Sequence, residues 1–127
     1  VLSFGVNDCT ATTHGQPRVP HDETIATTQR IVQEARQVWP VLMIGPPPVG
    51  RACPDGRTRA LSHAMAALCA RLSVPFLPVW EPLLAHSAWC AEIARGDGAH
   101  PAGGGYAALA RIVHGWPAWR EWMGPLP

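Results

Sequence analysis

Short apolar runs alternate along the chain with longer segments in which apolar residues recur every three or four positions. The runs at 1–4, 41–44 and 74–79 have the length of buried strands, and glycine or proline lies in or beside each of them. A segment with helical spacing follows each run. This alternation predicts an α/β fold, a three-layer α/β/α sandwich in which helices cover both faces of a parallel sheet.

Four segments carry the helical pattern. In the first, Asp22 or Thr24 is placed to cap a helix that Pro40 closes. The second is the most regular, with polar residues such as Ser62 opposite its apolar face. The third covers 83–95, and the fourth follows a glycine-rich turn. The positions assigned to apolar faces are Ile25, Val32, Ala35 and Trp39 in the first helix, Leu61, Ala64, Met65, Leu68, Cys69 and Leu72 in the second, and Tyr106, Leu109, Ala110 and Val113 in the last.

Composition narrows the class of protein. The chain has 127 residues, of which 47% are hydrophobic and 15% are charged, which is enough material for one compact domain over 1–127 and too little for two. Ten basic and nine acidic residues give a net charge of +1 without a basic cluster, which argues against a nucleic-acid partner. No apolar stretch approaches the roughly 18 residues that would predict a membrane span.

The cysteines indicate a reducing compartment. Cys9, Cys53, Cys69 and Cys90 are far apart and form neither a Cys-x-x-Cys pair nor a cluster with histidine at metal-ligand spacing. We therefore expect free thiols, no metal site and a cytoplasmic protein, although a disulfide between two of them stays open.

Candidate chemistry gathers where the predicted strands end, because ligands of open parallel sheets bind beyond the carboxyl ends of the strands. Asn7 follows the first strand, and its amide could stabilise an oxyanion. The alternative is an ordinary turn at 5–8. Glu81 follows the third strand, where it is placed either to contact a substrate or to begin a helix.

Asp97 and His100 are three residues apart in a glycine-rich loop, and Pro101 then leads into a helix. At this spacing a carboxylate can fold back on the imidazole, hold one tautomer through Nδ1 and leave Nε2 to accept a proton. The alternative is a turn in which Asp97 caps the helix and His100 is a solvated neighbour.

Three tryptophans recur every third residue near the end of the chain. Trp116, Trp119 and Trp122 either form an apolar lip for a substrate or partner, or hold the C-terminal segment over the core. We favour the second interpretation. His14 and His21 lie in a polar loop and are expected to be solvated.

Taken together, these segments resemble the SGNH hydrolases, also called the GDSL esterase and lipase family. Residues 1–8, Val-Leu-Ser-Phe-Gly-Val-Asn-Asp, look like the family's third block, a strand followed by Gly-x-Asn-Asp. Residues 97–101, Asp-Gly-Ala-His-Pro, look like its fifth block, Asp-x-x-His. The strands that end at Gly45 and Trp80 also fit in order and spacing. The resemblance implies the flavodoxin-like SGNH hydrolase fold.

The resemblance also implies roles for individual residues. His100 matches the general base, Asp97 its orienting carboxylate, Asn7 the oxyanion-hole asparagine and Gly5 the motif glycine. The nucleophilic serine of the family's Gly-Asp-Ser block would lie upstream, in strand-helix units of roughly 60 residues at about 30 per unit. The serines of this chain, which lack that context, are Ser3, Ser62, Ser73 and Ser87.

The sequence thus predicts the C-terminal portion of a serine esterase or lipase that cleaves small acyl or acetyl esters without a metal or organic cofactor. The expected partners are a small-molecule ester and the N-terminal segment, which could be a separate chain. Gly5 and Glu81 are further candidates for substrate contact. The competing hypothesis is a non-catalytic module that keeps the fold and binds a ligand without the nucleophile.

Overall fold

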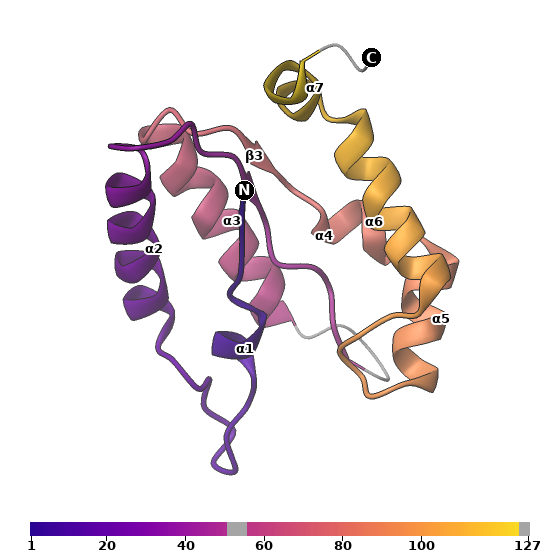
Figure 1. Ribbon diagram of the computed structural model, residues 1–127. Coiled ribbons are helices and arrows are strands. Elements are labelled where there is room, and N and C mark those ends of the chain that lie inside the picture. The colour runs from indigo at the N-terminus through magenta and orange to yellow at the C-terminus, as the bar shows by residue number, and fades with distance from the viewer. Residues whose placement is uncertain (51–55, 125–127) are drawn as a thin grey trace.

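A small parallel sheet lies at the centre of the molecule (Figure 1). The computed structural model describes residues 1–50 and 56–124. Leu2 pairs with Met43, and Met43 pairs with Phe76, so the described strands follow one another in the order β1-β2-β3. The strands are β1 (Leu2–Ser3), β2 (Met43–Ile44) and β3 (Phe76–Leu77).

Helices connect the strands and follow the last of them. The crossover from β1 to β2 passes through α1 and α2, and the crossover from β2 to β3 passes through α3, as the alternating pattern predicts. Within the described residues the helices are α1 (Val6–Cys9), α2 (His21–Ala35), α3 (Gly56–Arg71), α4 (Trp80–Leu84), α5 (Ser87–Arg95), α6 (Gly103–Gly115) and α7 (Pro117–Met123).

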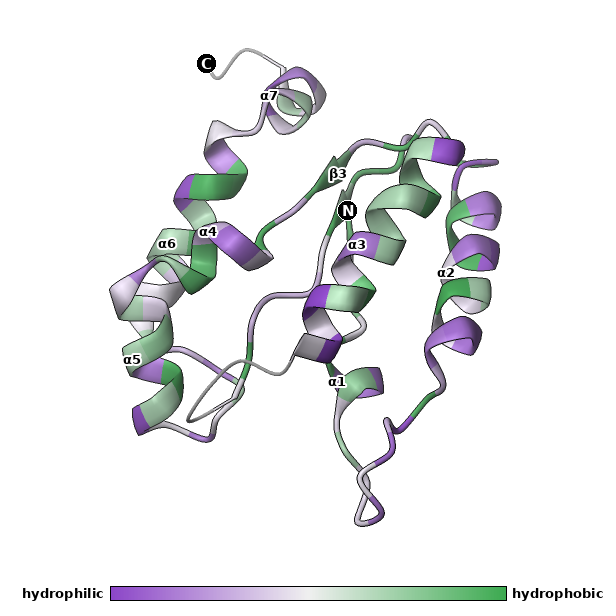
Figure 2. Cartoon of the chain, turned by 180° about the vertical axis from the view of Figure 1, so that it is seen from behind, coloured by the Kyte–Doolittle hydropathy of each residue, from purple (hydrophilic) through white to green (hydrophobic). Residues whose placement is uncertain are grey.

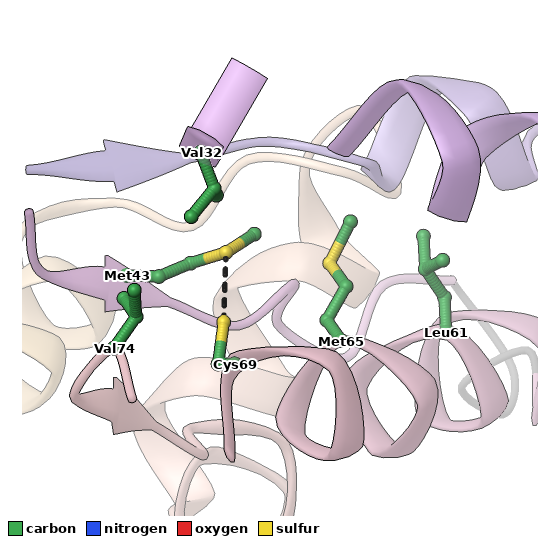
Figure 3. Close-up of a cluster of buried hydrophobic side chains, with 6 residues drawn as sticks. All are labelled: Val32, Met43, Leu61, Met65, Cys69 and Val74. Atoms are coloured by element: carbon green, nitrogen blue, oxygen red, sulfur yellow. Dashed lines mark hydrogen bonds between the residues drawn. The ribbon is translucent and has the colours of Figure 1, made fainter. Parts of the chain in front are cut away.

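Two apolar cores cover the two faces of the sheet, which confirms the layered α/β architecture. Successive strand residues point to opposite faces, so Met43 enters one core and Ile44 contacts the other. The first core joins the sheet to α2 and α3 (Figure 3), and its Cys69 Sγ lies 3.5 Å from Met43 Sδ. The second core joins the sheet to α4, α5 and α6 around Leu83 and Ile93. In Figure 2, β3 is hydrophobic, whereas α2 alternates between hydrophobic and hydrophilic residues.

The first long helix differs from its prediction at both ends. It begins at His21 after Pro20, so neither Asp22 nor Thr24 is its cap. It ends at Ala35, after which the N–H groups of Gln37 and Val38 bond to the third preceding residue, as in a tighter helical turn. Trp39 is consequently 66% exposed and is not a core residue.

The later helices also depart from the pattern. The segment predicted as one helix over 83–95 is broken by the extended backbone of His86 into α4 and α5. Ser62, predicted on a polar face, is buried beside Gly45. On α6 the fully buried residues are Gly105 and Ala108, and the predicted positions Leu109 and Val113 pack against the second core partly buried. Tyr106 and Ala110 are among the exposed residues of that helix.

The C-terminal helix is only loosely attached to the core. Trp116 packs against the second core, as expected of a residue that holds this segment down. Trp119 and Trp122 instead contact each other, with ring centroids 5.5 Å apart, and no residue of α7 is buried. The prediction that all three tryptophans cover the core is therefore wrong for the last two.

Three of the cysteines, Cys9, Cys69 and Cys90, are free thiols, as predicted. Burial raises the pKa of the Cys69 thiol, which favours its neutral form. Cys53 lies outside the described residues. None of the helices in the described part of the chain is long and apolar enough to cross a bilayer.

Gly5 joins β1 to α1 in a conformation that favours glycine. Its φ is +105°, and a Cβ atom there would lie 2.8 Å from Leu61 Cδ2 and 3.1 Å from Met65 Cε. The predicted turn at 5–8 is thus a positive-φ glycine followed by one helical turn. Because Gly5 packs directly on α3, it fixes the point where the chain leaves the sheet.

Gly5→Ala is expected to lower the free energy of unfolding by about 2–4 kcal/mol, since it adds both backbone strain and overpacking. Gly15→Ala is the matched control, because Gly15 also has a positive φ, +76°, but nothing lies within 4 Å of its Cβ position. Urea unfolding of the two variants checks the difference. Equal losses of stability would show that the contact with α3 contributes nothing.

Candidate active site

A cleft of about 730 Å³ lies along the β1 edge of the sheet, where the segments that follow β1 and β2 meet. Its walls come from both helical layers, with Ile31 of α2 on one side and Leu109 of α6 on the other. Asn7 and His100, which are far apart in sequence, both line this cleft. Gly5 lines it too. The structure therefore brings three of the predicted site residues to one place.

Asp97 and His100 form a closed local unit in the loop between α5 and α6. Asp97 Oδ2 lies 2.7 Å from His100 Nδ1. Asp97 Oδ1 accepts hydrogen bonds from the backbone N–H groups of Ala99 and His100, each at 2.8 Å. Both carboxylate oxygens are thus engaged within four residues of chain. This arrangement holds the carboxylate against the ring.

The electrostatics of the pair define the tautomer of the imidazole. The hydrogen bond to His100, followed by those from the two backbone N–H groups, holds the pKa of Asp97 well below its usual range. An ionised carboxylate can only accept hydrogen bonds, so Nδ1 of His100 carries the hydrogen. In the neutral ring Nε2 is then unprotonated, on a side chain that is 73% exposed. Such a ring is prepared to accept a proton at Nε2.

Asn7 lies in the first turn of the short helix α1, immediately after Gly5 and Val6. It is exposed, and its side-chain amide makes no hydrogen bond to the described residues, so its two N–H donors are available to a ligand in the cleft. The neighbouring Asp8 is engaged elsewhere, because its Oδ2 accepts a hydrogen bond from Thr24 Oγ1 at 3.4 Å.

Glu81 lies apart from the cleft, in the first turn of α4. Its Oε1 is 3.0 Å from Arg59 Nε and 3.4 Å from His63 Nε2. The hydrogen bond from Arg59 lowers the pKa of Glu81. The Arg59 guanidinium also lies over the Trp80 ring, 5.2 Å from its centroid. The structure thus places Glu81 in a surface ion pair between α3 and α4, away from Asn7 and His100.

Two residues that the sequence did not single out support the cleft. Trp89 of α5 is almost fully buried, donates its indole N–H to the Pro48 carbonyl at 2.9 Å and meets the Tyr106 ring edge to face. Glu92, one turn later, accepts hydrogen bonds from the first turn of α6. The sequence signal for Glu92 was the glycine run at 103–105, which permits close approach of a side chain to the backbone.

The described residues do not supply a nucleophile in contact with the base. No serine hydroxyl among them forms a hydrogen bond to His100, and Ser62 is buried beside Gly45. Ser3 lines the cleft, but it lies within β1 rather than beyond its end. Across residues 1–50 and 56–124, no group of three or more His, Cys, Asp or Glu is arranged to hold a metal ion.

The model of the GDSL-like lipase/acylhydrolase family matches residues 1–108, which include β1, Gly5, Asn7 and the loop that carries Asp97 and His100. No curated protein matches the chain.

Proposed function

The chain belongs to the GDSL-like lipase/acylhydrolase family, and from that membership we propose that it supplies the base and oxyanion-binding half of a serine esterase. The substrates are small acyl or acetyl esters. The observation that carries the proposal is the 2.7 Å contact between Asp97 and His100, together with the position of His100 in the same cleft as the free amide of Asn7. Acyl transfer needs both kinds of group, a base that takes the proton of the nucleophile and a donor that stabilises the oxyanion.

The three residues have distinct tasks in the proposed reaction. Nε2 of His100 takes the proton of a serine hydroxyl as the serine oxygen bonds to the ester carbonyl carbon. Asp97 stabilises the imidazolium that forms, and the Asn7 amide donates to the carbonyl oxygen as it becomes an oxyanion. His100 then gives its proton to the departing alcohol. Water repeats the sequence on the acyl-serine and releases the acid.

The nucleophilic serine is proposed to lie on a segment outside 1–127 that pairs with the edge of β1. In the described sheet β1 pairs only with β2, and the cleft extends along its other side between α2 and α6. Ser3 is exposed there. A strand added at this edge would end next to Asn7 and His100, because parallel strands end on the same side of a sheet. Residues 1–127 are then the C-terminal portion of one domain.

Asn7→Ala is expected to lower kcat of the complete esterase by about 10²- to 10³-fold, the loss typical of one oxyanion donor. The reason is that the amide contributes most when charge develops on the carbonyl oxygen. Initial rates with p-nitrophenyl acetate measure the effect, and Gln29→Ala, an exposed amide of α2, is the control. An unchanged kcat in the Asn7 variant would remove this residue from the oxyanion hole.

A non-catalytic binding module is the second candidate, favoured by the fact that no serine among the described residues is bonded to His100. Such a module would use the same cleft to hold an ester without cleaving it. It predicts saturable ligand binding that Asn7→Ala weakens, with no turnover.

Ester hydrolysis by two forms of the protein separates the candidates. One form is residues 1–127, and the other combines them with the upstream segment, in one chain or as two. The proposal predicts hydrolysis of p-nitrophenyl acetate by the combined form alone. Absence of turnover by a folded combined form would favour the binding module. Turnover by residues 1–127 that depends on His100 would place the serine inside this chain.

A further inference from the structure

We propose that Glu92 is a positioning residue for His100, an inference that rests on the proposed function. Glu92 lies on α5, one turn before the loop that carries Asp97 and His100, and does not line the cleft. Its side chain acts by fixing the end of that loop at α6, while the backbone of α5 holds the other end. The family match and the Asp-x-x-His spacing say nothing about this residue.

The side chain of Glu92 holds the far end of the loop. Oε1 accepts a hydrogen bond from the backbone N–H of Gly104 at 3.1 Å, and Oε2 accepts one from Gly105 at 2.7 Å. These N–H groups belong to the first turn of α6, where no intrahelical acceptor exists. Ala102, the residue at the cap position, has no side chain that could bond to them. A half-buried carboxylate from the neighbouring helix therefore takes the place of the cap.

The backbone around Glu92 holds the near end of the same loop. The Glu92 carbonyl accepts a hydrogen bond from the N–H of Gly96 at 3.0 Å, and the Ile93 carbonyl accepts one from Gly98 at 3.2 Å. Asp97 lies between these two anchors, and His100 lies between Gly98 and the start of α6. One turn of α5 thus fixes the backbone on both sides of the catalytic pair.

The glycine run before α6 is shaped for this contact. A Cβ atom on Gly104 would lie 2.6 Å from Glu92 Oε1, and one on Gly105 would lie 2.4 Å from Pro101 Cβ. Gly103, by contrast, has nothing within 4 Å of its Cβ position. Glycine is therefore needed where the carboxylate and Pro101 approach the helix, and it is not needed one residue earlier.

A helix cap alone would contribute stability without affecting the imidazole. The exposed ring of His100 makes one side-chain hydrogen bond among the described residues, and its acceptor is Asp97 in the same loop. The geometry of that bond therefore depends on how the loop is held. If Glu92 positions the loop, its loss changes the tautomer and orientation of His100 even where the fold survives.

The first test reads the His100 ring directly, without any need for activity. Two-bond ¹H–¹⁵N correlation spectra of residues 1–127 report which ring nitrogen carries the hydrogen. The expected result is an Nδ1-protonated neutral ring in the parent and a mixture of tautomers in Glu92→Ala and Glu92→Gln. Gly104→Ala should give the same mixture, because its methyl group displaces the carboxylate. Gly103→Ala, the matched control, should keep the parent spectrum.

The second test is kinetic and uses the complete esterase. Displacing a catalytic group by about 1 Å can cost on the order of 10²-fold, and we expect Glu92→Ala to lose about that factor in kcat with little change in KM. Ile93→Val, a neighbouring change in the second core, controls for a general loss of stability. A folded Glu92→Gln or Gly104→Ala variant with the parent tautomer and kcat would overturn the proposal. If the complete protein has no esterase activity but the Glu92 variants still shift the His100 tautomer, the result would support positioning by Glu92 and contradict the proposed function.

Discussion

Replacing His100 with alanine is expected to lower kcat of the complete esterase by on the order of 10⁶-fold, close to the loss of the whole catalytic group. The reason is that Nε2 of His100 both removes the serine proton and returns it to the leaving alcohol. Asp97 is not placed to replace it, because Asp97 does not line the cleft. Initial rates with p-nitrophenyl acetate at matched protein concentration measure the loss.

His114→Ala is the control for the His100 variant. His114 is also an exposed histidine, but it lies near the end of α6 and does not line the cleft. It should retain the parent rate. Hydrolysis by a folded His100→Ala protein at the parent rate would mean that another group is the base.

Asp97→Asn is expected to lower kcat by about 10⁴-fold while the loop keeps its shape. The amide oxygen of Asn can still accept the two backbone N–H bonds that Asp97 Oδ1 accepts from Ala99 and His100. Its NH₂ group, however, would face Nδ1 as a donor and move the ring hydrogen to Nε2. The imidazole would then present a donor where the reaction needs an acceptor.

Two measurements check the Asp97 variant together. The rate assay should show the loss in kcat, and the ¹⁵N spectrum of the ring should show Nε2 protonated. Asp22→Asn is the matched control, since Asp22 also accepts a local backbone hydrogen bond, from Glu23, in an exposed position. A reduced rate with an unchanged tautomer would contradict the stated reason for the loss.

The parts of the site that the sequence predicted are those that local chain geometry determines. Asp97 and His100 meet because a carboxylate three residues before a histidine can bond both the loop backbone and the ring. Gly5 could be expected to turn the chain because only glycine adopts its positive φ freely. The parallel sheet with helices on both faces followed from the alternation of short apolar runs with helical segments.

The parts that the sequence missed depend on contacts between distant elements. Nothing in the local pattern shows that Glu81 pairs with Arg59 of α3 instead of facing the cleft. Trp39 has helical spacing from Val32, but the helix ends before it, so its side chain remains exposed. Glu92 looks like an ordinary polar helix position until α6 is placed beside α5. The roles of such residues can be predicted only when the packing of whole helices and strands is known.

The central claim is that His100 and Asp97 serve a serine supplied at the edge of β1. Labelling the combined protein with a serine-directed alkyl phosphonate, followed by peptide mapping of the adduct, tests it most directly. The predicted result is one adduct per molecule on a serine outside 1–127, formed much more slowly in His100→Ala. An adduct on Ser3, or no adduct on a folded combined protein, would contradict the claim.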